Sequence, residues 1–354
     1  MQTRQPVVLK TQALTKNADL KRWFLVALLL STWLPISFFI LVAPSGTQGL
    51  GLTAIKTIFL FLGTAHVPAT LLFYTDKEFS AIIQSNRVRY IYIPILLIFV
   101  TGLVFAFLST TIQAFVLLAY WSWQTFHYGR QNVGIYAFAS IAETGRAPRK
   151  VEKMAIEAGT LLAILGTFKI LGMAVAPVYL HRTFDFLYHF GVVTFVAVLV
   201  FSLAVYAKFY RDTTPFKTIF FFTAIFFFLP VFISTDNNIA FTSYAMAHGV
   251  QYVVFMLVIS ATAVEGASRA LPYKSLAKFL VFLLVLGFMF WRVGDLKEME
   301  IVKQVSSYTT AAGFLFGAVL GATASHFIVD ADAWRLSVAN QRAFMTKRFY
   351  FVFN

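Results

Sequence analysis

The sequence of 354 residues contains no cysteine and few charged residues. Without cysteine the chain can form no disulfide, no thiolate metal site, no cysteine nucleophile and no thioether link to haem. Any metal must therefore be held by imidazole, carboxylate or amide ligands. Charged residues make up only 12% of the chain, which is far below the share that a soluble domain carries on its surface.

Apolar residues take the place of the missing charge. They make up 59% of the chain, which includes 41 phenylalanines, and the mean hydropathy is +0.75. A helix that spans a membrane needs about 20 mainly apolar residues. Such runs recur near 22–43, 51–74, 89–108, 111–138, 154–179, 189–210, 217–235, 236–262, 276–292 and 307–328. The sequence therefore predicts an all-α polytopic integral membrane protein with about ten transmembrane helices in a single domain, residues 1–354.

The distribution of basic residues predicts how the chain is oriented. The 29 Lys and Arg outnumber the 15 Asp and Glu, and most of them fall before the first run or in every second segment between runs. By the positive-inside rule, both termini are cytoplasmic, with residues 1–21 as an N-terminal segment and 329–354 as a basic, aromatic tail along the inner surface. The basic excess thus indicates topology and attraction to anionic membrane lipid, not nucleic-acid binding. We expect a multi-pass protein of the bacterial inner membrane.

Four of the predicted helices carry one histidine each at a similar depth. The residues are His66, His127, His248 and His326. All four helices run from the outer face inward, and the histidines lie about 12 to 19 residues along them, or roughly 18 to 29 Å at 1.5 Å per residue. This common depth predicts one metal site with four imidazole ligands. A single histidine in a membrane helix is more often a hydrogen-bonding group between helices, and that alternative stays open for each of them.

Further polar side chains lie on the same helix faces as these histidines. A polar stripe that faced lipid would be costly, so the stripes are expected to face inward. Metal-bound imidazole also needs a partner for its second nitrogen. We expect this orienting role for Gln124, Gln131, Gln251 and Asp330, with Asp330 as an alternative ligand. Tyr120 and Tyr244 share these faces and are expected to contact oxygen or substrate.

Three other features of the helices need separate explanations. Lys169 lies deep in a predicted helix, where a lysine is a functional candidate; pairing with a carboxylate is favoured over a Schiff base to retinal. His181 and His189 flank the outer end of a helix and belong to another layer. A ladder of glycines at positions 313, 317 and 321 predicts close helix packing.

A short motif links the chain to a known family. Residues Phe126–Gly129 read FHYG, and separate histidines lie on several other predicted helices. In these features the chain resembles the Brp/Blh family of membrane carotene dioxygenases. The resemblance implies iron held by the four histidines and central cleavage of a carotene into retinal. The chain departs from the family where Arg130 follows the motif, in having no adjacent histidine pair, and in its larger number of predicted spans.

Together these features favour an oxidoreductase that uses molecular oxygen. Imidazole suits iron, zinc and copper, and an iron held by histidines with open positions can activate dioxygen. We expect Fe2+, with Zn or Cu as alternatives, and a hydrophobic substrate from the bilayer such as a carotenoid or lipid. Two other functions stay open: a proton-coupled transporter whose path is lined by the histidines and Lys169, and an electron-transfer protein that binds haem or quinone.

Overall fold

Every element that the structure describes is a helix. A computed structural model describes residues 5–42, 50–234, 236–263, 272–292 and 310–353. Eight helical segments in these ranges are long and apolar enough to cross a bilayer: Asn17–Val42, Gly51–Thr75, Val88–Phe107, Lys150–Ala174, Val178–Asp212, Asn237–Ala261, Tyr273–Arg292 and Thr310–Ala333. The all-α, multi-pass membrane architecture predicted from the sequence is thereby confirmed.

Two of the ten predicted runs form helices outside this group of eight. The run 111–138 lies within α6, Thr110–Thr144, which has 35 residues but is too polar to be counted with the others. The run 217–235 is divided between α9, Pro215–Phe226, and α10, Pro230–Ile233. Twelve residues of α-helix cover only about 18 Å, whereas the hydrocarbon core is about 30 Å thick. Pro230 has no amide hydrogen to donate, so the chain restarts as a new helix at that residue.

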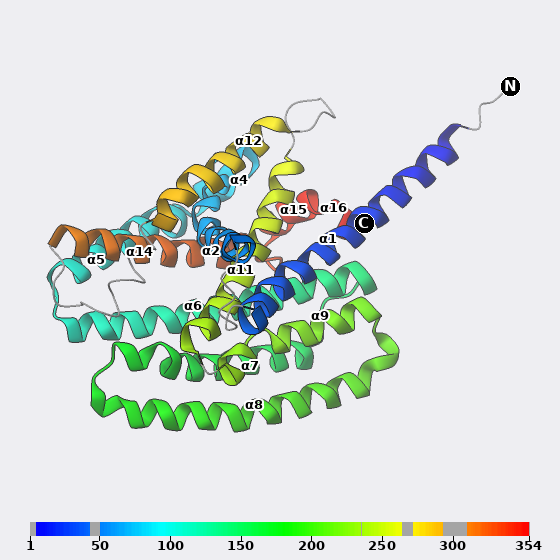
Figure 1. The fold of residues 1–354 in the computed structure, drawn as a ribbon. Coiled ribbons are helices and arrows are strands. Elements are labelled where there is room, and N and C mark those ends of the chain that lie inside the picture. The colour runs from blue at the N-terminus through cyan, green and yellow to red at the C-terminus, as the bar shows by residue number, and fades with distance from the viewer. Residues whose placement is uncertain (1–4, 43–49, 235, 264–271, 293–309, 354) are drawn as a thin grey trace.

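The helices form two packed groups around a central helix (Figure 1). In one group, α6 lies along α7, Lys150–Ile170, which lies along α8, His181–Phe209. In the other, α5, Ile93–Phe107, runs along α14, Thr310–Ala333. Between them α11, Asn237–Ala261, packs on α1, Gln5–Ser37, and on α2, Leu50–Ala69. The predicted N-terminal segment is thus helical from Gln5 and continuous with the first span.

Shorter helices join these long ones. They are η1 (Phe38–Val42), α3 (Leu71–Thr75), α4 (Lys77–Ser85), η3 (Val88–Tyr92), η4 (Gly172–Ala174), η5 (Val178–Leu180), η6 (Tyr210–Asp212), α12 (Tyr273–Val281), η7 (Phe282–Leu286), α15 (Ala339–Arg348) and α16 (Tyr350–Phe353). The break between α2 and α3 follows Pro68, and it places Thr70 in a turn beside the centre of the bundle.

The glycine ladder of α14 lies directly against α5. A Cβ atom added to Gly321 would lie 2.6 Å from Ile98 Cα, and one on Gly317 would lie 2.9 Å from Gly102 Cα. Contacts this short are not tolerated, so only glycine lets the two backbones approach this closely. The close packing predicted from the ladder is confirmed, and it holds α14 in a fixed position relative to α5.

The C-terminal residues differ from the expected surface helix. Phe349 is fully buried, and its ring lies 5.1 to 5.6 Å from the rings of Phe24, Phe138 and Phe255. Arg348 is only 1% exposed and donates to Asp76 Oδ2 at 2.6 Å and to the Thr262 carbonyl at 2.9 Å. At Arg348 and Phe349 the expected helix along the membrane surface is wrong, because protein partners bind the guanidinium and protein rings bury the phenyl group.

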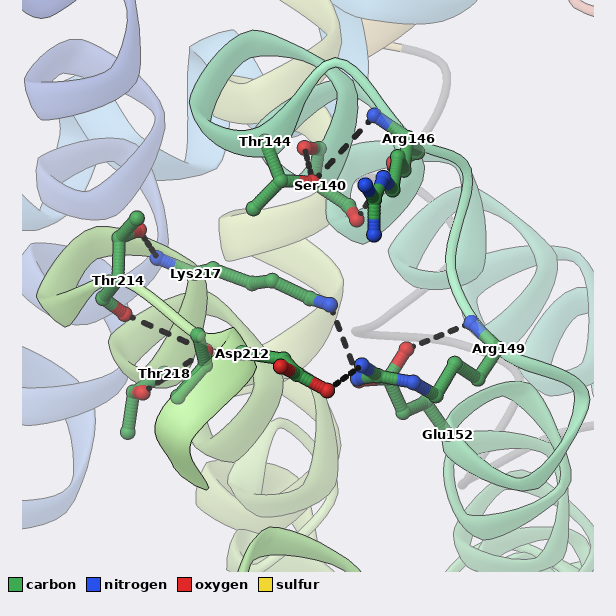
Figure 2. Close-up of polar contacts among 10 residues, drawn as sticks. Ser140, Thr144, Arg146, Arg149, Glu152, Asp212, Thr214, Lys217 and Thr218 are labelled. Carbon is green, nitrogen blue, oxygen red and sulfur yellow. Dashed lines mark hydrogen bonds and ion pairs between the residues drawn. The ribbon is translucent and has the colours of Figure 1, made fainter. Parts of the chain in front are cut away.

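A polar network joins η6, the start of α7 and the start of α9 (Figure 2). Lys217 Nζ lies 3.1 Å from Glu152 Oε1, and both side chains are almost fully buried. Arg149 donates its backbone amide to Glu152 Oε2 at 2.6 Å and its guanidinium to Asp212 Oδ2 at 2.8 Å. Thr214 caps α9 by accepting from the Lys217 amide at 3.2 Å. The buried Lys217 charge therefore has a carboxylate partner that is itself held in place.

We predict that Glu152→Gln destabilises the fold by about 3 to 5 kcal/mol, because it keeps an acceptor for the Arg149 amide but leaves the buried Lys217 charge uncompensated. The free energy of unfolding in detergent measures this loss. The matched control is Glu157→Gln on the same helix, whose ion pair with Arg130 is about half exposed. That change is expected to cost about 0 to 1 kcal/mol. Equal losses in the two variants would contradict the prediction.

Candidate metal centre

Four helices bring one histidine each to the centre of the bundle. The histidines are His66 on α2, His127 on α6, His248 on α11 and His326 on α14, and all are buried. Four ring pairs have centroids 4.9 to 5.2 Å apart: His66 with His248, His66 with His326, His127 with His248, and His127 with His326. The His248 and His326 centroids are 6.3 Å apart. The rings thus surround one point.

These spacings match the size of a mononuclear metal site. A metal–nitrogen bond of about 2.1 Å places the centroid of an imidazole about 3.2 Å from the metal. In a tetrahedral site, neighbouring centroids would then lie about 5.2 Å apart, and opposite rings in a planar site about 6.4 Å apart. The four distances of 4.9 to 5.2 Å are close to the tetrahedral value, and the 6.3 Å distance is close to the value for opposite rings in a planar site. The ring spacings are thus compatible with one shared ion, and His66, His248 and His326 bring their ligand atoms closest to the distances that such an ion requires.

The ring nitrogens that face this centre have no hydrogen-bond partner. His66 Nδ1 donates to the Gly63 carbonyl at 2.5 Å, which leaves Nε2 as the nitrogen with the free lone pair. His326 Nδ1 is bonded to Thr70 Oγ1 at 2.6 Å, which again leaves Nε2. Nε2 of His66, His127 and His326 and both ring nitrogens of His248 are buried and unpartnered among the described residues. Unpaired buried polar atoms are costly, and a metal ion would satisfy the free lone pairs.

Asp330 adds a carboxylate at one edge of the centre. Asp330 Oδ2 lies 3.5 Å from His326 Nε2 and 3.9 Å from His127 Nε2, and the residue is only 3% exposed. Its Oδ1 accepts a hydrogen bond from Tyr252 at 2.9 Å. Ligand atoms of His66, His248 and His326 lie within 4.8 Å of one another, as do those of His127, His326 and Asp330. Asp330 is therefore placed either to ligate an ion or to hold two of its imidazole ligands.

Tyr252 and Thr70 belong to this site, although the sequence analysis did not single them out. The Tyr252 hydroxyl bonds Thr70 Oγ1 at 2.9 Å and donates to Asp330, so a chain of hydrogen bonds runs from His326 Nδ1 to the carboxylate. The sequence does contain a pattern that points to both residues, because Thr70 follows His66 by four residues and Tyr252 follows His248 by four. Such spacing places each pair on one side of a helix.

The three glutamines lie near the histidines but bond other groups. Gln124 donates to the Tyr128 hydroxyl at 2.6 Å. Gln131 donates to Gln251 Oε1 at 2.9 Å and to the His248 carbonyl at 3.1 Å, and Gln251 donates to Thr32 Oγ1 at 2.6 Å. The expected direct bonds to imidazole nitrogens are thus replaced by bonds that fix the backbone of α11 and its neighbours.

The two tyrosines expected near oxygen or substrate pack among other aromatic rings. Tyr120 stacks on Phe327, with centroids 6.1 Å apart, and Phe327 in turn stacks on the His127 ring at 4.4 Å. The ring of Tyr244 lies 6.0 Å from that of Tyr128, which packs against His248 at 4.0 Å. Each tyrosine therefore reaches a histidine through one intervening ring.

The remaining titratable candidates lie outside the cluster. Lys169 Nζ is 2.9 Å from Asp185 Oδ1 and 4.6 Å from the centre of the Tyr188 ring, so it pairs with a carboxylate as favoured from the sequence. His181 begins α8, and its Nε2 is 3.3 Å from the Ala176 carbonyl. His189 contacts Tyr188, with centroids 5.6 Å apart. None of these contacts includes a histidine of the central cluster.

A cavity of about 680 Å³ adjoins the histidine cluster. It shares His326 and Thr70 with the centre and is lined almost wholly by apolar side chains of α2, α3, η3, α5, α14 and residues 286–290. Its volume is in the range of small-molecule sites, about 300 to 1,000 Å³. Neither Tyr120 nor Tyr244 lines it. A reactant in this cavity would lie against the His326 side of the centre.

Close contact between α2 and α11 sets the distance from His66 to His248. A Cβ atom added to Gly249 would lie 2.5 Å from Gly63 Cα, 2.8 Å from the Gly63 carbonyl oxygen and 2.9 Å from His66 Nδ1. The Gly63 carbonyl is also the acceptor that orients the His66 ring. A side chain at Gly249 would therefore push apart the two helices and disturb the ring together.

We predict that Gly249→Ala weakens metal binding about 10- to 100-fold, the range seen when a partner of a metal ligand is lost. Metal affinity, measured by competition with a chelator, tests this. Gly134→Ala is the control, because a Cβ there meets no atom within 4 Å and alanine favours the helix. If both variants bind metal as the parent protein does, the spacing of α2 and α11 does not control the site.

Comparison with known proteins adds no family to these observations. No protein-family model, curated protein or solved structure matches the chain. The resemblance to the Brp/Blh family stays a prediction, and function is inferred from the histidine cluster and the cavity beside it.

Proposed function

We propose that the chain is a membrane-embedded oxygenase that uses a histidine-ligated, non-haem metal ion, Fe2+, to act on a hydrophobic substrate with molecular oxygen. The observation that carries this proposal is the set of buried, unpartnered imidazole nitrogens around one point, at the wall of an apolar cavity. Zinc and copper also suit imidazole ligands. Iron is favoured by the resemblance of FHYG and the scattered histidines to the Brp/Blh family.

The residues have distinct roles in this proposal. His66, His127, His248 and His326 hold the ion, which supplies the ability to bind and activate dioxygen. Asp330 either completes the ligand set or accepts from a ligand, and its position is fixed by Tyr252. Phe327 and Tyr128 cover the His127 and His248 rings and keep water from them. The substrate, a carotenoid or lipid, would come from the bilayer into the cavity at His326.

The alternative functions receive less support from the contacts. In a transporter path Lys169 would join the histidines, whereas it bonds Asp185 and Tyr188 instead. A haem held between His248 and His326 would need a clear plane between them. His66 and His127 lie about 5 Å from both rings and occupy that plane. A purified protein without a Soret band is expected on these grounds.

We predict that the four histidines act as one unit. His66→Ala, His127→Ala, His248→Ala and His326→Ala should each lose bound metal and nearly all activity while still inserting in the membrane, because each leaves an incomplete ligand set. Elemental analysis of the detergent-purified variants measures the metal. His181→Ala and His189→Ala are controls that should keep it. If the histidines are only hydrogen-bonding groups between helices, each change costs roughly 0.6 to 2 kcal/mol and the parent protein holds no metal.

We further propose about ten spans with cytoplasmic termini in a bacterial inner membrane. The eight apolar segments, α6 and the α9–α10 pair together give ten, and an even number places both termini on one side. The side is indicated by the basic residues, most of which lie in segments that then face the cytoplasm.

A reporter fused after Asn354 tests this orientation. We expect a reporter that works in the cytoplasm to be active there and one that works only outside to be inactive. The reason is that the basic segments near 75–90 and 129–153 keep their side of the protein in the cytoplasm. A fusion after residue 109, between α5 and α6, is the opposite control and should report the outer side. Activity of the Asn354 fusion on the outer side would reverse the topology.

A further inference from the structure

The cavity beside His326 connects the lipid-facing surface with the buried centre. Ile95 and Met289 line it and are 61% and 60% exposed, whereas Thr70 and His326 line it and are 4% and 3% exposed. In a membrane, side chains that are exposed on spanning segments face the hydrocarbon. One continuous space of about 680 Å³ therefore extends from hydrocarbon to the candidate metal site.

The polar groups that line the cavity are already bonded within the protein. The Tyr74 hydroxyl donates to the Tyr90 carbonyl at 2.5 Å, and the Tyr90 hydroxyl donates to Asp332 Oδ2 at 2.9 Å. Ser325 Oγ bonds the Gly321 and Pro94 carbonyls, at 2.7 and 3.1 Å. Thr70 Oγ1 bonds Tyr252 and His326.

Because these hydroxyl groups already donate their hydrogens within the protein, the cavity offers few polar contacts to a bound molecule. Among the side-chain polar atoms of the described lining residues, only His326 Nε2 lacks a hydrogen-bond partner, and it is a buried atom of the candidate metal site. A carbonyl group on a bound molecule would give up its bonds to water and find no free donor hydrogen among the lining side chains, which costs about 1 to 3 kcal/mol or more. An unsubstituted hydrocarbon has no such loss.

Each wall of the cavity contains a tight helix contact. On one side, Gly321 fixes α14 against Ile98 of α5. On the other, a Cβ on Gly287 would lie 2.5 Å from the Ala65 Cβ, so the helix that follows η7 packs closely on α2. Each wall is therefore a closely packed pair of helices, and the space lies between the two pairs.

We propose that this cavity binds the unsubstituted hydrocarbon segment of a molecule dissolved in the bilayer, which enters sideways between Ile95 and Met289 and comes to lie against His326. Any polar end group stays outside the cavity, at the lipid-facing rim. The inference rests on the proposed function in taking His326 as the reactive edge, and it deepens that function by naming the recognised part of the substrate and its route.

Photolabelling in lipid nanodiscs tests the proposal. The probe is a saturated fatty acid with an aliphatic diazirine in mid-chain, and labelled residues are located by peptide mass spectrometry. We expect label on Ile98, Leu286 and Ala322, which line the cavity. Ala322→Trp should reduce this labelling several-fold, because the indole fills the space. Leu315→Trp, at a lipid-facing position of α14 that is 62% exposed, is the matched control and should leave the labelling unchanged.

Competition with unlabelled molecules identifies the source of the chain. A polyene hydrocarbon and a saturated fatty acid are each added in excess, and the one that abolishes labelling is the preferred occupant. A fatty acid with a mid-chain keto group should compete much less well than its parent, because the hydroxyl hydrogens of the lining are already donated to protein acceptors. Equal competition would overturn the proposal.

Failure of the hydrocarbon site can be distinguished from failure of the metal site. Labelling is repeated after chelation, and metal content is measured on the same preparation. Persistent cavity labelling in a protein that never binds metal would reject the oxygenase but keep the hydrocarbon site. Label spread evenly over lipid-facing residues, and unaffected by Ala322→Trp, would reject the hydrocarbon site whatever the metal content. If Ala322→Trp does not fold, Leu286→Trp on the opposite wall replaces it.

Discussion

The structure is organised by the cost of burying polar groups where no water can reach them. A membrane helix satisfies its own backbone, but a buried imidazole has two nitrogens that need partners. Hydrogen bonds to Gly63 and Thr70 satisfy one nitrogen each of His66 and His326, and the unsatisfied nitrogens converge. The close contact of α2 with α11, the polar character of α6 and the fixed position of α14 all serve this convergence.

The sequence predicted the parts of the site that depend on depth and helical spacing. The four histidines, which were expected at one depth on helices of one direction, are brought to one place by the fold, and the glycine ladder of α14 packs on α5. Helix geometry sets which residues share a face, but it does not say which neighbouring helix meets that face. For this reason Gln124 was expected to bond a histidine, whereas it bonds Tyr128.

Elements that depend on tertiary partners could not be predicted from local pattern. The basic, aromatic character of residues 335–354 is typical of a membrane-surface helix, but Asp76 and the Thr262 carbonyl bind Arg348, and the aromatic rings enter the core. Likewise, the apolar run 217–235 predicted one continuous helix, where Pro230 separates two short helices. In both places composition indicated an apolar environment, but it did not indicate the path of the chain within it.

The bond between Thr70 and His326 joins residues that are 256 positions apart. Contacts of such long sequence separation form late, since most of the chain must be made and inserted first. His66, His127 and His248 must therefore remain in the membrane with incomplete partners until α14 arrives from the ribosome. During synthesis the early helices can already pack on one another, and the arrival of His326 is the step that completes the set of four imidazoles.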